Sequence, residues 1–107
     1  MGAPIRYSAN VVLDGNGRGA VRIAPAGKDW TIRYLSVRCS DVASEAIASL
    51  YENVIGPDYL IDVSFTGSSG DTTDTVIDVR DGYGVWIEWV GGTPGTTATV
   101  TYTGEEF

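Results

Sequence analysis

The feature that most constrains this chain is the regular alternation of short β-favouring runs with turn-forming clusters. Clusters of Gly, Pro, Asp and Ser recur about every 8–12 residues, for example DGNG at 14–17, PAG at 25–27 and GGTPG at 91–95. This spacing predicts an all-β fold, a single eight-stranded antiparallel β-sandwich that is jelly-roll-like. The predicted strands are Ile5–Leu13, Gly19–Ile23, Trp30–Cys39, Ala46–Val54, Tyr59–Phe65, Thr75–Arg80, Val85–Val90 and Thr96–Thr103.

The predicted strand 30–39 contains a break in its two-residue alternation. Apolar residues from Trp30 to Tyr34 share one phase, whereas those from Leu35 to Cys39 share the other. Because successive side chains of a strand point to opposite faces, a regular strand cannot bury both sets. A β-bulge near Tyr34 and Leu35 would turn both toward the core.

Two further stretches are less regular. In the segment 41–50, Asp41 or Ser44 is a suitable cap for a short helical turn, but a strand over 46–54 competes with it. We favour the strand after a short turn. The segment GSSGDTTD at 67–74 is predicted to be the longest polar loop.

A length of 107 residues fits one domain, and 43% hydrophobic residues is ordinary for a folded one. We expect an N-terminal extended segment or first strand over 1–14, the β-sandwich domain over 15–104, and an acidic tail over 105–107. Neither a signal-peptide pattern nor an apolar run of membrane-spanning length is present in the sequence. We therefore expect neither export nor membrane association.

The residue types argue against catalysis. The chain has no His and one Cys, which excludes the usual Ser–His, Cys–His and zinc arrangements. Cys39 lies in an apolar run and is expected to be buried. Asp62, Asp78 and Glu88 alternate with apolar neighbours inside predicted strands, so we expect them on a solvent face. The prediction is that the protein is not an enzyme.

The loop sequences predict no metal or cofactor site, and the charge predicts no nucleic-acid partner. The loop that begins at Asp14 starts like a calcium loop, but Arg18 and Pro25 occupy ligand positions. Asp71 and Asp74 in the polar loop are expected to be solvated. The glycines fit no dinucleotide-binding or P-loop spacing. The net charge is −7 and the seven basic residues are scattered, whereas phosphate binding needs clustered Lys and Arg.

The tryptophans are the most informative side chains. Trp86 and Trp89 are three residues apart in one predicted strand, so they point to opposite faces. We assign Trp89 to the core and Trp86 to the face of Glu88, where an exposed Trp would mark a contact surface. Alternatively, a loop or the N-terminal segment covers Trp86. Trp30, at a strand start, is expected in the core.

The runs VWIEWV at 85–90, GGTPG at 91–95 and GRGAV at 17–21 are strand-and-turn pieces of a recurring kind. With three further runs, they resemble small β-rich virion proteins of tailed bacteriophages that infect actinobacteria. The resemblance covers residues 15–104 and leaves 1–14 outside, and six Arg against one Lys is compatible with such a source. It implies a structural role without catalytic residues. The runs that carry it are VWIEWV at 85–90, GGTPG at 91–95, TATV at 97–100, GRGAV at 17–21, WTI at 30–32 and LID through FTG at 60–67.

The function expected from this resemblance is that of a capsid decoration protein. It would dock on the assembled head, stabilise it, and act as a homotrimer bound to the major capsid protein or other virion proteins. Its location would be the virion, after synthesis in the host cytoplasm. The segment 1–8 would supply part of the contact. The candidate interaction residues are Ile5, Arg6, Tyr7, Tyr83 and Trp86.

Two alternatives remain open at this stage. The same fold would serve a minor tail or host-attachment protein, which differs in copy number and position. A carbohydrate-binding β-sandwich module is the other, because exposed Trp86, Tyr83 and Tyr59 would form a platform on which sugar rings stack.

Overall fold

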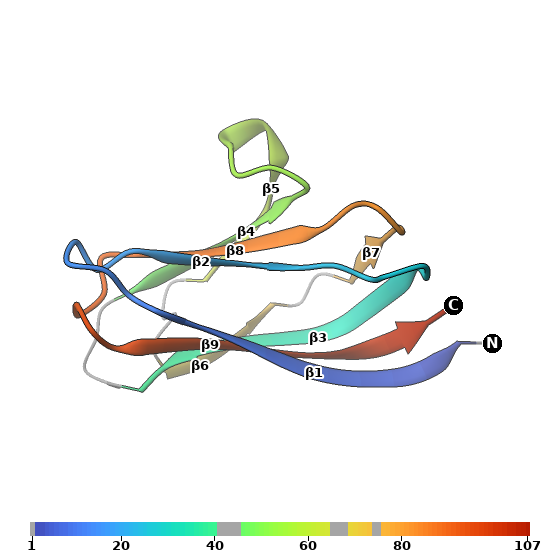
Figure 1. Ribbon diagram of the computed structural model, residues 1–107, viewed down its shortest axis with the longest axis horizontal. Helices are drawn as coiled ribbons and strands as arrows, with labels where there is room; N and C mark the ends of the chain where they lie inside the picture. Colours follow the sequence, from blue (N-terminus) through green and yellow to red (C-terminus); the bar gives the residue numbers. More distant parts are fainter. Residues whose placement is uncertain (1, 41–45, 65–68, 74–75) are drawn as a thin grey trace.

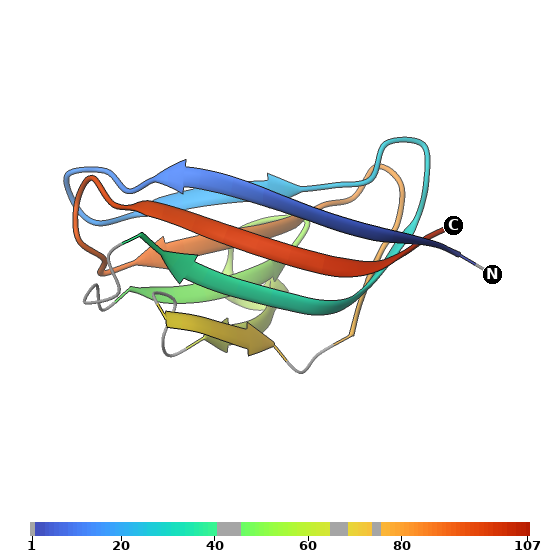
Figure 2. The ribbon, with the colours of Figure 1, turned by 90° about the horizontal axis from the view of Figure 1, so that it is seen from below.

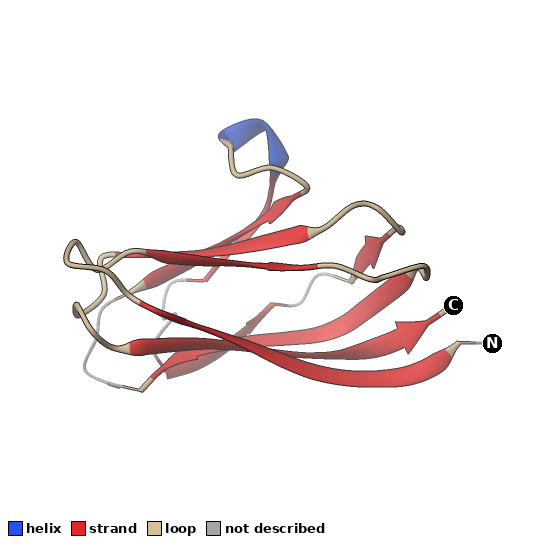
Figure 3. Cartoon of the chain, in the orientation of Figure 1, coloured by secondary structure: helices blue, strands red, loops and turns tan. Residues whose placement is uncertain are grey.

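The computed structural model describes residues 2–40, 46–64, 69–73 and 76–107. Nearly all of its regular structure is strand, with a single 3₁₀ turn, η1, at Pro57–Tyr59 (Figure 3). The described strands are β1 Ala3–Val12, β2 Gly19–Ile23, β3 Trp30–Cys39, β4 Ile47–Glu52, β5 Leu60–Ser64, β6 Ser69–Thr73, β7 Ile77–Val79, β8 Val85–Val90 and β9 Thr97–Glu106.

The strands form two antiparallel sheets that lie one above the other (Figure 1). Sheet A has the order β1-β9-β3-β6, with β7 also paired to β3, and sheet B has the order β2-β8-β4-β5. β6 pairs with residues 35–38 of β3 and β7 with residues 30–32, so together they act as one interrupted edge strand. Counted so, the sandwich has eight strands in jelly-roll order, as the sequence predicted.

β2, β3 and β8 begin and end where the sequence predicted, and the other predicted strands differ from the observed ones by one to three residues at each end. The polar loop predicted over 67–74 is wrong for Ser69–Thr73, which forms β6. The strand predicted from Tyr59 begins at Leu60, because the preceding residues form η1. β4 confirms the strand favoured over a helical turn near residue 50. The two residues proposed as helix caps, Asp41 and Ser44, lie outside the described residues.

The core lies between the sheets and follows the two-residue alternation of the strands. In β8 the residues Val85, Ile87 and Trp89 are buried, and Trp89 is 0% exposed. Trp30 and Cys39 are also buried, which confirms their assignment to the core. The strands whose side chains the structure describes thus each turn one face to a common apolar layer, as expected for a sandwich.

The predicted bulge in β3 exists, one residue earlier than expected. The register with β9 shifts between Ile32 and Tyr34, so Ile32 and Leu35 both face the core. Tyr34 was expected on the core side, and this was wrong, because it follows the bulge and alternates with buried Leu35. Its side chain is 67% exposed on the outer face of sheet A.

The bulge depends on a glycine in the neighbouring strand. Gly104 of β9 is paired with Ile32 on one side and Ile5 on the other. A Cβ at this position would overlap the carbonyl oxygen of Thr31 and lie 2.9 Å from the Cα of Ile32. Gly104 therefore allows the backbones of β3 and β9 to approach closely at the irregular point.

Both chain ends belong to the sheet. β1 pairs with β9 along all ten of its residues, and β9 extends through Glu105 and Glu106, which had been assigned to an acidic tail. Beyond the strand, the N–H of Phe107 donates to the carbonyl of Asp29 over 2.8 Å. The two termini consequently lie side by side at one end of the sandwich (Figure 1).

We expect Gly104→Ala to lower the free energy of unfolding by about 2–3 kcal/mol, because the new methyl group meets backbone atoms that cannot move aside. Gly15→Ala is the matched control, since a Cβ there has no atom within 4 Å, and it should change stability by less than about 0.5 kcal/mol. Urea denaturation of both variants checks this. Equal stabilities would contradict the proposed close approach of β3 and β9.

Candidate interaction surface

Trp86 lies on the outer face of sheet B. It is in β8 with Glu88 and Val90 on the same side of the strand, opposite the buried face that contains Trp89. This confirms the predicted partition of the two tryptophans. The N-terminal segment does not cover Trp86, because β1 belongs to the other sheet. The indole is half-buried between its cross-strand neighbours.

The strand register surrounds Trp86 with further apolar side chains. It is paired with Arg22 of β2 on one side and Tyr51 of β4 on the other, and Tyr51 is paired with Leu60 of β5. Two pleats further along β8, beyond the pair of Glu88 and Ser49, Val90 is paired with Ile47. Because directly opposed residues point to the same face, these side chains share one surface. We call it the apolar face of sheet B: Ile47, Tyr51, Leu60, Trp86 and Val90.

The aliphatic members of this face are well exposed. Ile47, Leu60 and Val90 keep 43%, 46% and 40% of their surface accessible. Isolated exposed aliphatic residues are common on proteins, but here they flank a tryptophan and a tyrosine on one sheet face. Arg22 borders the face at the β2 edge, and its guanidinium lies against the Cα of Gly84. An arginine beside aromatic residues is a composition typical of protein interfaces.

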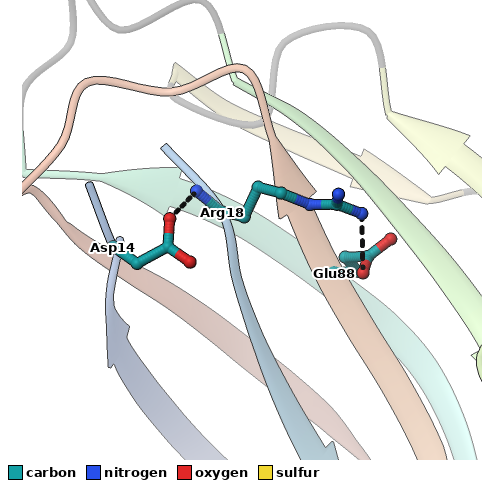
Figure 4. Close-up of polar contacts among 3 residues, drawn as sticks. All are labelled: Asp14, Arg18 and Glu88. Carbon is teal, nitrogen blue, oxygen red and sulfur yellow. Dashed lines mark hydrogen bonds and ion pairs between the residues drawn. The ribbon is translucent and has the colours of Figure 1, made fainter. Parts of the chain in front are cut away.

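The acidic residue on this side of sheet B is neutralised. Glu88 forms an ion pair with Arg18, with 3.6 Å between Oε2 and Nη2, and the carboxylate side chain is only 18% exposed. The turn before β2 positions Arg18, because Asp14 Oδ1 accepts a hydrogen bond of 3.0 Å from the backbone N–H of Arg18 (Figure 4). The same oxygen accepts a second bond, of 2.8 Å, from the backbone N–H of Asn16. These bonds, first that from Arg18, hold the pKa of Asp14 below its ordinary value. Asp14 therefore shapes the turn from which Arg18 reaches Glu88.

The candidate residues derived from the sequence do not form one surface. Ile5 is 8% exposed and packs in the core, so it offers no contact area. Arg6 points outward from sheet A, on the side of the sandwich opposite to Trp86. Tyr83 is exposed in the turn before β8. The N-terminal strand and Trp86 therefore belong to two separate faces.

The remaining candidate, Tyr7, belongs to an aromatic cluster at the end of sheet A near the termini. Its ring centroid lies 5.7 Å from that of Trp30 and 5.9 Å from that of Tyr102, and the last two are 5.6 Å apart. Tyr7 is nearly half exposed, whereas Trp30 and Tyr102 are buried. Burial, reinforced by Tyr7, raises the pKa of Tyr102 to about 12. The role of Tyr7 seen here is to cover this cluster.

Sequence reasoning missed Ile47, Tyr51 and Leu60. The alternation in β4 already places Ile47 and Tyr51 out of phase with buried Ala48 and Leu50, so their outward direction was accessible. That they share a sheet face with Trp86 could not be predicted from the sequence, because it depends on which strands pair and in which register. Tyr59, proposed as part of a sugar platform, lies exposed in η1 next to Leu60.

The other predicted polar sites contain little chemistry. Asp78 is exposed, as predicted, and accepts a hydrogen bond of 2.9 Å from the hydroxyl of Thr31. The side chains of Asp62 and Asp71, and the whole of Asp74, lie outside the described part of the chain. Among the residues that the structure describes, no group of three or more His, Cys, Asp or Glu side chains is placed to hold a metal ion.

Comparison with known proteins identifies no relative. No family model, no curated protein and no solved structure matches this chain. Within the described residues, no helix has the length and apolar character needed to cross a membrane. The outer faces of the two sheets are therefore the features from which a function can be inferred.

The raised pKa of Tyr102 predicts a loss of stability at high pH. An unfolded tyrosine releases its proton near pH 10.0, whereas folded Tyr102 keeps it until about pH 12. Its contribution is therefore complete below pH 10 and disappears between pH 10 and 12, a loss of about 2–3 kcal/mol. Urea denaturation at pH 9 and pH 11.5 measures it.

Tyr102→Phe should show a weaker decline in stability over the same pH interval, because the shifted proton is gone. Tyr34→Phe, which removes an exposed phenol, controls for the loss of one tyrosine. Identical declines in the two variants would contradict the assignment to Tyr102.

Proposed function

We propose that the protein is a non-enzymatic structural component of a phage virion, a capsid decoration protein that docks on the assembled head through the apolar face of sheet B. The observation that carries the proposal is that exposed Ile47, Leu60 and Val90 share one outer face with half-buried Trp86 and Tyr51. The resemblance of residues 15–104 to β-rich virion proteins supplies the class of partner. The jelly-roll strand order is in keeping with it, since this architecture recurs among viral capsid domains.

The apolar face has the composition of a protein-binding surface. When a partner covers apolar groups that were in contact with water, the free energy of binding becomes more favourable by roughly 25 cal/mol per Å² of buried apolar surface. Trp, Tyr and Arg are enriched among the residues that contribute most to binding, and Trp86, Tyr51 and Arg22 stand side by side across three strands. The Arg18–Glu88 pair lowers the cost of covering this side, because neither charge is then left without its partner.

Stabilisation of the head follows from mass action. A protein that binds the assembled shell and not its free subunits shifts the equilibrium toward the shell. In the proposed arrangement the sandwich docks as a homotrimer on major capsid protein, and its net charge of −7 favours a basic patch on the shell. Binding as a trimer would multiply the contribution of a modest surface on each copy.

The copy number in purified particles tests the location. Quantitative mass spectrometry should find the protein in hundreds of copies per particle, in a fixed ratio to the major capsid protein. A few copies per particle would replace decoration by a minor tail or host-attachment role. Absence from the particles would overturn the virion assignment.

Docking should depend on the apolar face. We expect Trp86→Ala to weaken binding to heads that lack the protein by about 30-fold, because an interface tryptophan often contributes about 2 kcal/mol. Leu60→Ser should weaken it as well, through an exposed position that folding does not need buried. Sedimentation of protein with such heads measures both.

Val12→Ala is the matched control for docking, since Val12 is an aliphatic residue on the outer face of sheet A that is even more exposed than Leu60. Circular dichroism verifies that all variants remain folded. Unchanged binding of Trp86→Ala and Leu60→Ser would reject the apolar face as the docking surface.

A further inference from the structure

The outer face of sheet A differs chemically from that of sheet B. The central strand β9 directs Thr97, Thr99, Thr101 and Thr103 to this side, while Ala98, Val100 and Tyr102 are buried. In register with Thr101 stand Ser8 of β1 and Ser36 of β3. Figure 2, in which the sandwich is seen from below, shows β1, β9 and β3 side by side. The middle of the face is thus a set of hydroxyl groups on a regular sheet.

A hollow of about 330 Å³ lies in this hydroxyl-rich face, and we call it the Arg6–Arg38 hollow. Arg6 of β1 and Arg38 of β3 line it from the two strands that flank β9, and Ser8 and Thr101 contribute hydroxyl groups between them. Tyr7 completes the lining. The volume is at the lower end of the range for small-ligand sites.

The two arginines of the hollow differ from the remaining arginine that the structure describes in sheet A. Arg33, the third arginine of sheet A, forms an ion pair of 3.5 Å with Glu105. Neither Arg6 nor Arg38 forms an ion pair with any carboxylate that the structure describes. In a chain with a net charge of −7, two such cations on one hollow make a local positive site.

We propose that the Arg6–Arg38 hollow binds an acidic saccharide through a sugar carboxylate or sulfate group. The planar guanidinium fork matches both groups, and the hydroxyls of Ser8 and Thr101 suit the hydroxyls of the sugar ring. Exposed Tyr34 lies in register with Thr103, one pleat from Thr101, where it offers an aromatic surface for a neighbouring ring.

The chemistry of the face favours a saccharide over the other polyanions. A protein interface normally has an apolar centre, whereas the centre here consists of hydroxyl and guanidinium groups. Nucleic-acid binding requires several phosphate contacts from clustered basic residues, and two arginines on an acidic protein are too few. A saccharide needs only one anionic group and several hydroxyl partners.

Titration calorimetry of the full chain with oligogalacturonate and with sulfated dextran oligosaccharides tests the site, with neutral dextran as a control. We expect binding of at least one acidic saccharide, no binding of neutral dextran, and about a tenfold loss of affinity in each of Arg6→Gln and Arg38→Gln. Arg80→Gln removes the same charge from an exposed position outside the hollow and should leave the affinity within about twofold.

Three results would overturn the proposal: no binding of either acidic saccharide, equal losses in all three Arg→Gln variants, or tighter binding of polyglutamate. Equal losses would show a non-specific charge effect, and polyglutamate binding would reassign the hollow to an acidic protein segment. The head-docking assay separates this proposal from the proposed function, because Arg6→Gln and Arg38→Gln leave the apolar face of sheet B intact.

Discussion

The pairing of β9 with β1 and β3 is the interaction on which the rest of this structure depends. β9 pairs ten of its residues with β1 and nine with β3, and Arg33 is the unpaired extra residue of β3 at the bulge. The last strand of the chain, β9, is thereby paired with the first strand, β1. The two-sided pairing is possible at the bulge because residue 104 has no side chain. Without the pairing of β9 to both neighbours, the buried face of sheet A would have no continuous surface against sheet B.

A sandwich built this way has two outer faces whose chemistry is independent. Each strand contributes its buried residues to one shared core, but its outward residues are not constrained by packing. In this protein the outward residues of β9 from Thr97 to Thr103 are threonines, whereas those of β8 are Trp86, Glu88 and Val90. The hydroxyl-rich face and the apolar face are therefore separated by the thickness of the core, which allows each to acquire a partner of its own.

The sequence was informative wherever a local rule determines the structure. Turn residues bounded β2, β3 and β8, and the two-residue period separated Trp86 from Trp89. Local rules failed for β6, whose SGDTT sequence lacks apolar alternation and reads as a loop, although β3 offers it an edge to pair with. They failed also for Ile5, which is buried because β1 closes the edge of sheet A and is not a free arm.

The candidate surfaces could be predicted only in part, for a physical reason. The direction of a side chain follows from its own strand, but its neighbours follow from pairing across strands that are distant in sequence. Trp86 could be placed outward, yet its position between Arg22 and Tyr51 required the register of β8 with two other strands. Arg6 and Arg38 are likewise 32 positions apart and meet only because β9, near the end of the chain, inserts between their strands. Binding surfaces on a jelly roll are therefore properties of topology, which single-sequence patterns do not encode.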